Sequence, residues 1–178
     1  MATNRRIEVK PIAGALGAEI SGVDLRDVDD ATFDDIHDAW LEHQVVFFRD
    51  QDITPEQQIA FSKRFGEIDH HPFIKGMEEY PDILEIIKEE SDTRAFGSTW
   101  HTDQMFNPKP AKATILYAKE TPDAGGDTMF VNMYQAYDTL SEPMKAMISG
   151  VKTWNVGSRK KLSETDKMGS STEGRYKG

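Results

Sequence analysis

The sequence of 178 residues is long enough for one domain with a buried core, and its 38% hydrophobic and 29% charged residues exclude a membrane-embedded or fully disordered chain. With 31 acidic and 21 basic residues the formal net charge is −10, which argues against binding to nucleic acid or to an anionic membrane, because phosphate contacts need Lys and Arg. The sequence has no Cys, so disulfides, zinc fingers, iron–sulfur clusters and Cys nucleophiles are excluded.

The first residues hold two Arg but no apolar run behind them, so we expect no secretory signal. No stretch approaches the length of a membrane span. These features, with the absence of Cys, favour a cytoplasmic protein. The composition still allows a small anionic substrate in a local pocket, and it is compatible with a homo-oligomer.

In the first third of the chain, apolar spacing predicts strands and helices in turn. Two short strands with Gly turns are expected over residues 7–25, and a buried strand over residues 45–48. Between them a helix is predicted over residues 30–43, capped by Asp29 or Asp30, with one face made of Phe33, Ile36, Trp40 and Leu41. A second helix begins with a capping box formed by Thr54 and Gln57 around Pro55, carries Phe61 and Phe65 on one face, and can close at Gly66.

Strands dominate the prediction for the second half. We expect them at residues 83–87, 113–118, 128–132 and 151–156, with a polar loop over 88–99 and a helix over 141–148. Residues 157–178 contain almost no apolar side chains, which predicts a mobile loop or lid. The pattern favours one domain over residues 1–178, mostly β with flanking helices (an α+β design), rather than a doubly wound sheet.

The segment Trp100-His101-Thr102-Asp103 is the most informative for chemistry. Side chains two residues apart on a strand point to the same side, so His101 and Asp103 would project together, with Thr102 facing away. An imidazole nitrogen with a carboxylate oxygen suits Fe(II), Mn(II) or Zn(II). Taken alone the pattern is weak, because both residue types are common on protein surfaces.

Two other segments carry candidate site residues. In Gly125-Gly126-Asp127-Thr128 the glycines indicate a hairpin turn, and the Thr128 hydroxyl could donate a hydrogen bond to a carboxylate. In His70-His71-Pro72, adjacent side chains on an extended chain point opposite ways, so at most one histidine would face a given pocket. A structural role for either histidine is about as well supported as a functional one.

Together these segments resemble the taurine dioxygenase family of Fe(II)- and 2-oxoglutarate-dependent oxygenases. The Trp-His-Thr-Asp and Gly-Gly-Asp-Thr blocks at this separation are a specific signature. The resemblance runs through nearly the whole chain, and its other stretches are residues 17–25, 45–49, 64–66, 136–137 and 140–141.

The resemblance implies a double-stranded β-helix, or jelly roll, with outer helices. It implies that His101 and Asp103 are two members of a facial iron triad, which leaves three positions for 2-oxoglutarate and O₂. It assigns Thr128 to a carboxylate of 2-oxoglutarate, and His71, Ile74, Gly97 and Gln104 to the primary substrate. The implied activity is hydroxylation of a small organic acid, with release of succinate and CO₂.

Departures from the family pattern bear on the substrate. Ile74 stands where the taurine enzymes present a tyrosine to the sulfonate, and Gly97 stands where they present an asparagine. Because a buried sulfonate needs paired donors, these changes argue against taurine. They favour a more apolar acid, such as an aryloxyalkanoate or an alkyl sulfate.

The larger departure concerns the metal site. The family's third iron ligand is a downstream histidine, followed by an arginine that pairs with 2-oxoglutarate, but this sequence has no His after His101. We therefore expect the jelly roll to be incomplete in this chain, which would be the N-terminal part of the domain and inactive alone. The alternatives are a non-catalytic jelly-roll domain that binds a ligand without a complete metal site, or a short enzyme in which His70 or His71 is the third ligand.

Overall fold

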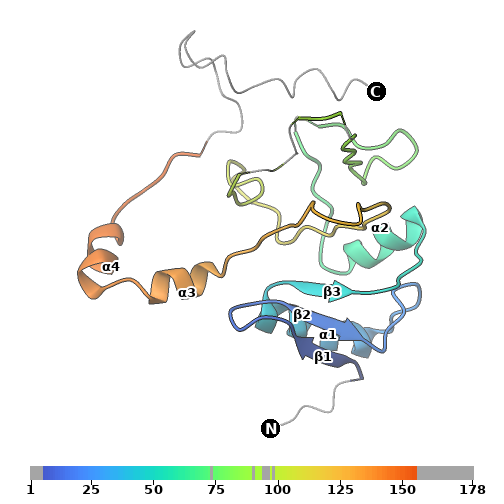
Figure 1. Cartoon of the computed structure of the whole chain (residues 1–178), viewed down its shortest axis with the longest axis horizontal. Helices are drawn as coiled ribbons and strands as arrows, with labels where there is room; N and C mark the ends of the chain where they lie inside the picture. Colours follow the sequence, from blue (N-terminus) through green and yellow to red (C-terminus); the bar gives the residue numbers. More distant parts are fainter. Residues whose placement is uncertain (1–5, 73, 90, 94–96, 98, 156–178) are drawn as a thin grey trace. The chain divides into compact units, whose positions relative to one another are not determined.

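The computed structural model describes residues 6–72, 74–89, 91–93, 97 and 99–155. The chain groups into two compact units, one of residues 1–65 with 116–152 and the other of residues 66–115 with 153–178. The helices and strands of the described residues are labelled in Figure 1. By residue number, every one of them belongs to the first unit.

A three-stranded mixed sheet forms the base of the first unit. Strand β1 (Glu8–Pro11) pairs antiparallel with β2 (Ala18–Ser21), and β2 pairs parallel with β3 (Val46–Phe48), giving the order β1-β2-β3. The predictions of two strands in residues 7–25 and one at 45–48 are confirmed. The third strand is half-buried rather than buried, because its side chains lie at the edge of a small sheet.

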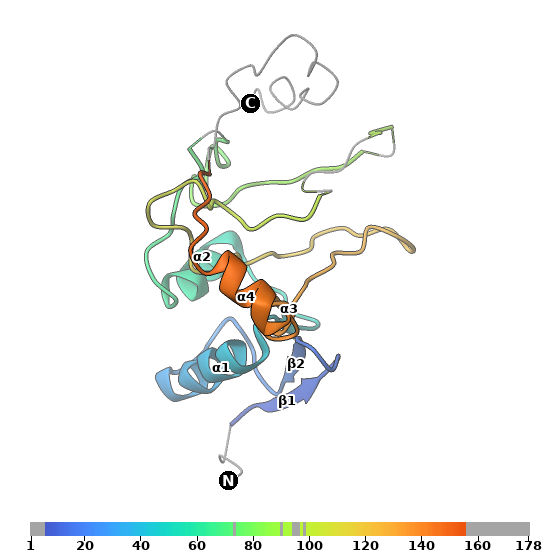
Figure 2. The ribbon, with the colours of Figure 1, turned by 90° about the vertical axis from the view of Figure 1, so that its left-hand side faces the viewer.

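Helix α1 (Asp30–His43) connects β2 to the parallel strand β3 and lies against both (Figure 2). It begins where predicted, because the Asp29 carboxylate accepts a hydrogen bond of 2.7 Å from the Thr32 N–H. Its buried face is formed by Phe33, Ile36 and Ala39, whereas Leu41 is 59% exposed. The prediction for Leu41 is wrong, because each residue turns the helix by about 100° and carries Leu41 past the buried stripe.

Helix α2 (Pro55–Lys63) begins with the predicted capping box, in which Thr54 and Gln57 exchange hydrogen bonds of 2.8 and 3.3 Å. It ends before Gly66, with Arg64 as its C-cap. Phe61 and Phe65 pack 5.5 Å apart, between their ring centroids. They join one aromatic cluster, most of whose contacts are edge-to-face and whose other members are Phe33, His37, Trp40 and Phe48.

The two remaining helices follow one another late in the chain. Helix α4 (Glu142–Ile148), with Ser141 as its N-cap, confirms the prediction for residues 141–148. Helix α3 (Met133–Asp138) was not predicted. Its N-cap is Asn132, whose side-chain oxygen accepts a hydrogen bond of 3.0 Å from the Gln135 N–H, so the residue expected to end a strand begins a helix instead.

The strand predictions for the second half are wrong for the described residues. Residues 83–87, 113–118, 128–132 and 151–155 form no strand, although each carries the apolar pattern of one. A strand needs a partner for its backbone N–H and C=O groups, and pairing among the described residues is confined to β1, β2 and β3. Large apolar side chains in these segments are therefore exposed, among them Ile87 at 61%, Leu116 at 67% and Trp154 at 91%.

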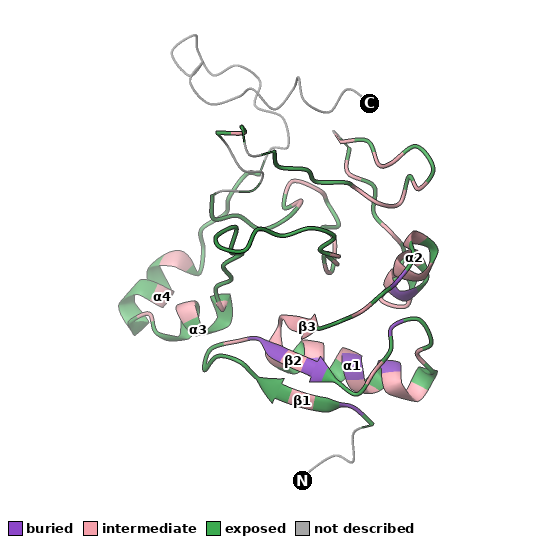
Figure 3. Cartoon of the chain, turned by 45° about the vertical axis from the view of Figure 1, so that its right-hand side comes forward, coloured by how far each residue is buried: buried purple, intermediate pink, exposed green. Residues whose placement is uncertain are grey.

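Burial is concentrated early in the chain. In the part that the structure describes, every buried residue lies at or before Phe61, on β2, α1, α2 and the segments beside them (Figure 3). None of the helices in the described ranges combines the length and apolarity needed to cross a membrane. The predicted lid at 157–178 lies outside the described residues.

Candidate functional site

The structure brings His101 and Asp103 together in the second unit. The Nε2 atom of His101 lies 3.2 Å from Oδ1 of Asp103, and both side chains are about half exposed. The segment is not a strand, since residues 100–102 have no regular secondary structure and a turn begins at Asp103. The two side chains therefore meet as predicted, but not through the alternation of a strand.

The other nitrogen of His101 fixes the tautomer of the ring. Nδ1 lies 2.6 Å from the Thr99 carbonyl oxygen, which can only accept, so Nδ1 carries a proton. In the neutral ring Nε2 then presents a lone pair to the Asp103 carboxylate. Two acceptors at this distance attract one another only through a shared proton or a metal cation.

The far oxygen of Asp103 is held as well. Its Oδ2 accepts a hydrogen bond of 2.8 Å from the Thr114 hydroxyl. One imidazole nitrogen of His101 and one carboxylate oxygen of Asp103 thus face each other. The other polar atom of each side chain is hydrogen-bonded to a neighbouring residue. This donor set suits a divalent iron or manganese ion.

The described residues do not supply a third ligand. They contain no group of three or more His, Cys, Asp or Glu side chains placed to hold a metal ion. His70 instead pairs with Asp82, with its Nε2 2.9 Å from Oδ1. Within the described ranges, then, neither His70 nor His71 completes the pair of His101 and Asp103.

His71 and Ile74, two predicted substrate positions, are in direct contact. The Ile74 backbone N–H donates a hydrogen bond of 3.1 Å to Nδ1 of His71. In the neutral ring the proton is therefore on Nε2, which makes that atom a donor. The His71 ring also packs edge-to-face on Phe106, with centroids 6.4 Å apart.

Gln104, another predicted substrate position, follows Asp103 directly and has a left-handed backbone with φ of 51°. Its side-chain Oε1 accepts a hydrogen bond of 2.6 Å from Asn107 Nδ2, which also lies 3.4 Å from an Asp69 oxygen. The Gln104 amide is held by its oxygen, so its NH₂ end is the donor left for a ligand. These contacts connect the turn after Asp103 to the segment that carries His71.

Gly97 lies beside the His101 ring. A Cβ atom added at this glycine would meet Cε1 of His101 at 3.2 Å, and its φ of +67° is one that side chains with a Cβ rarely adopt. The absence of a side chain at this position therefore leaves room for the imidazole. Thr128, the remaining predicted residue, is exposed and belongs to the other unit.

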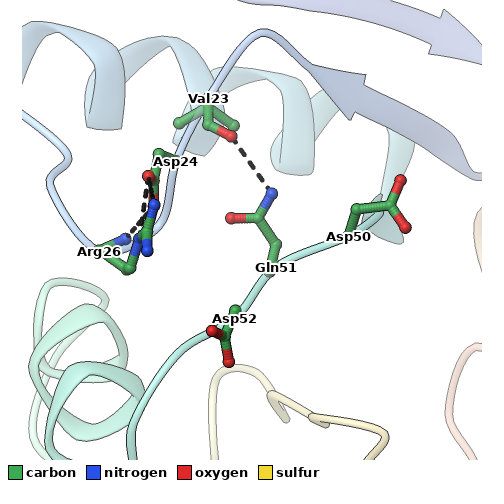
Figure 4. A pocket seen from close by; sticks show the side chains of 6 residues that line it. All are labelled: Val23, Asp24, Arg26, Asp50, Gln51 and Asp52. Atoms are coloured by element: carbon green, nitrogen blue, oxygen red, sulfur yellow. Dashed lines mark hydrogen bonds and ion pairs between the residues drawn. The ribbon is translucent and has the colours of Figure 1, made fainter.

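A polar pocket of about 200 Å³ lies in the first unit and contains none of the predicted site residues (Figure 4). Its lining includes three carboxylates and one cation, Arg26, which is already bound to Asp24 at 2.6 Å. The hydrogen bond from Arg26 holds the pKa of Asp24 below its ordinary value. Gln51 crosses the pocket and bonds to the backbone of Val23 and Leu25, so the pocket is built of structural contacts and repels an anionic substrate.

Comparison with known proteins decides the family. Residues 8–176 match the family model described as taurine catabolism dioxygenase TauD, TfdA family. The chain belongs to this family. It is 35% identical over 144 residues to an (S)-phenoxypropionate/alpha-ketoglutarate-dioxygenase of Sphingobium herbicidovorans, with 79% of this chain and 50% of that protein covered. It is 36% identical over 154 residues to an alpha-ketoglutarate-dependent sulfate ester dioxygenase of Pseudomonas putida, with 85% and 50% covered.

The structure of this chain is also similar to solved structures of dioxygenases. A taurine dioxygenase from Burkholderia xenovorans matches with a TM-score of 0.65 and 35% identity, over 81% of this chain and 51% of that one. The structure of AAD-2 in complex with Mn(II) and N-oxalylglycine matches with a TM-score of 0.58 and 30% identity, over 80% and 49%. The chain therefore spans about half the length of the relatives it matches.

Sequence reasoning missed Thr114 and Asn107. Thr114 stands in the apolar run of residues 113–118, where a lone hydroxyl among strand-forming side chains was the available signal. Asn107 follows Gln104 by three residues, which is the spacing of a β-turn. Its backbone N–H donates a hydrogen bond of 2.9 Å to the Gln104 carbonyl oxygen. Neither signal shows which side chain the polar group would contact.

Proposed function

We propose that the protein containing this chain is an Fe(II)- and 2-oxoglutarate-dependent dioxygenase that hydroxylates a small organic acid and releases succinate and CO₂. The observation that carries the proposal is the facing pair of His101 Nε2 and Asp103 Oδ1, 3.2 Å apart, in a chain of this family. When bound, iron with 2-oxoglutarate and O₂ supplies the oxidation of a substrate C–H bond.

His101 and Asp103 would hold the iron in this proposal. The Thr99 carbonyl orients the imidazole so that Nε2 faces the metal position, and Gly97 leaves space for the ring. The third ligand, and the arginine that pairs with 2-oxoglutarate, would come from outside the 178 residues. The same holds for the further strands that a jelly roll requires.

The co-substrate and the substrate would meet other side chains. Thr128 would donate to a carboxylate of 2-oxoglutarate. His71, with its proton on Nε2, and Gln104, with its NH₂ end available, would donate to the anionic group of the substrate, whereas Ile74 and Gly97 add no donor side chain. This set favours an aryloxyalkanoate, alkyl sulfate or apolar sulfonate over taurine.

The relatives act on substrates of this kind, since those described above are named for phenoxypropionate and for sulfate esters. The proposal includes a cytoplasmic protein without a nucleic-acid or membrane partner, and a homo-oligomer is compatible with it. Because the net charge is −10, an anionic substrate would be bound by a few hydrogen-bond donors in the site and not by a broad positive surface.

The experiment is succinate formation from 2-oxoglutarate by the full-length protein, across a panel of aryloxy acids, alkyl sulfates and sulfonates that includes taurine. We expect Asp103→Ala to abolish coupled hydroxylation and weaken iron binding, because it removes one of the two ligands in this chain. The matched control is Asp34→Ala, an exposed carboxylate on α1.

Normal activity and iron content in Asp103→Ala would contradict the ligand assignment. Efficient turnover of taurine would contradict the substrate class. A full-length protein that binds small acids but forms no succinate with any of them would support the alternative, a non-catalytic ligand-binding domain.

A further inference from the structure

Among the described contacts of the Asp103 carboxylate, the oxygen that faces away from His101 has one side-chain partner, Thr114. Its Oγ1 donates to Asp103 Oδ2 at 2.8 Å, while Oδ1 faces His101. The two oxygens of one carboxylate therefore have different partners. Eleven positions separate the two residues in sequence, so the contact depends on how this unit folds.

Carboxylates can bind a metal ion through one oxygen or through both. An oxygen that accepts a charge-assisted hydrogen bond has one lone pair engaged and its direction fixed, which disfavours a second bond to the same ion. A facial triad with a one-oxygen carboxylate leaves three of six positions open, as many as 2-oxoglutarate and O₂ require. Binding through both oxygens would close one of the three.

We propose that Thr114 is a positioning residue that keeps Asp103 a one-oxygen ligand and so preserves an open coordination position on the iron. The inference rests on the proposed function. Thr114 acts through Asp103 and does not itself touch the metal or the substrate in this account.

A purely structural role for this hydrogen bond is disfavoured by its surroundings. Asp103 is 52% exposed and Thr114 is exposed as well, so removing the hydroxyl leaves no buried polar group unpaired and opens no cavity. Loss of the hydroxyl should therefore change the metal site without a matching change in unfolding midpoint. This separation allows the two roles to be told apart.

The test uses Mn(II) as the probe in the full-length protein, with its affinity and its number of exchangeable water ligands measured by magnetic resonance. In Thr114→Val, which keeps the shape, we expect Mn(II) affinity to change by about tenfold and one bound water to be lost. Thr114→Ser keeps the hydroxyl and should restore both values. Thr114→Ala serves as a second hydroxyl-free variant should the valine disturb folding.

Thr139→Val is the matched control, because Thr139 is also exposed and its hydroxyl donates to a carbonyl, that of Ala136 in helix α3. We expect this control to leave Mn(II) binding unchanged. If wild type binds Mn(II) and both hydroxyl-free variants match it in affinity and water count, the role of Thr114 is refuted while the proposed function stands. If Thr114→Ser behaves like the valine, the hydroxyl is not the cause and the inference also fails. Absence of Mn(II) binding in wild type would refute the proposed function itself.

Discussion

Residues 6–65 and residues 66–155 differ in how far local sequence patterns become structure. The first region forms all three strands and two capped helices, and it holds every buried residue of the described chain. The second has a similar supply of apolar side chains but keeps large ones exposed, including Leu116, Met129 and Trp154. It nevertheless carries every predicted site position: the six for metal and substrate lie in one unit, and Thr128, predicted for 2-oxoglutarate, lies in the other.

The difference shows what a strand pattern requires. In the first region each strand finds its partner within about forty residues of sequence, through a turn or through α1. In the second region, the segments with a strand-like apolar pattern have no partner strand among the described residues. They therefore do not form strands. The contact between His101 and Asp103, by contrast, needs no strand partner, because the two residues are only two positions apart in sequence.

The largest effect is expected from expressing residues 1–178 by themselves. We predict no succinate formation with Fe(II) and 2-oxoglutarate, because two ligands hold iron loosely and fix no facial geometry. The exposed apolar side chains of the second region should cause self-association, measurable by light scattering. A monomeric product that forms succinate would overturn this prediction and restore His70 or His71 as a candidate third ligand.

A core substitution should confine its effect to stability. Ile36 is 0% exposed, so Ile36→Ala should lower the free energy of unfolding by about 2–5 kcal/mol. Leu41→Ala on the same helix is the matched control and should cost well under half as much. Denaturant unfolding of the full-length protein measures both, and equal losses would show that the buried face of α1 is assigned incorrectly.

Thr128→Val should confine its effect to function. The substitution keeps the shape and removes a donor to a carboxylate, and a hydrogen bond to a charged group is worth about 1.5–3 kcal/mol. The apparent affinity for 2-oxoglutarate should therefore fall by about ten- to a hundredfold. An unchanged KM for 2-oxoglutarate would place Thr128 outside the co-substrate site.

The smallest effect that we expect is on thermal stability, from the charge of Asp29 at the N-cap of α1, and it depends on pH. Hydrogen bonds from Thr32 lower the pKa of Asp29 from its ordinary value of 3.8 in the folded protein. A carboxylate of this kind stabilises the fold above about pH 4, and the contribution disappears as the pH falls through the lowered pKa.

In Asp29→Asn the side-chain oxygen still caps the helix, but the charge at the positive end of the helix is lost. We expect a Tm lower by about 1–4 °C at pH 7, and a difference that shrinks toward zero as the pH falls through the lowered pKa of Asp29. Thermal unfolding across this range measures the effect. A difference that grows as the pH falls would show that the charge does not stabilise α1.

The sequence by itself determined the parts of this protein whose causes are local. The starts of α1 and α2 follow from caps at Asp29 and Thr54, because a cap acts within three residues of itself, and α4 begins beside Pro143. The family also follows from local sequence, because the motifs around His101 and Asp103 carry the resemblance. Their side chains do meet, but not on the strand from which their spacing was interpreted.

Only the tertiary structure decided which patterned segments became strands and which polar groups support the candidate ligands. Asn132 begins a helix and donates to the Ala15 carbonyl, a contact across more than a hundred residues that no local pattern encodes. Thr114 reaches Asp103 because the chain returns past the turn at 103. Such contacts depend on where segments far apart in sequence lie in space. Burial, strand pairing and side-chain packing of many residues determine these positions jointly, so no single residue encodes them.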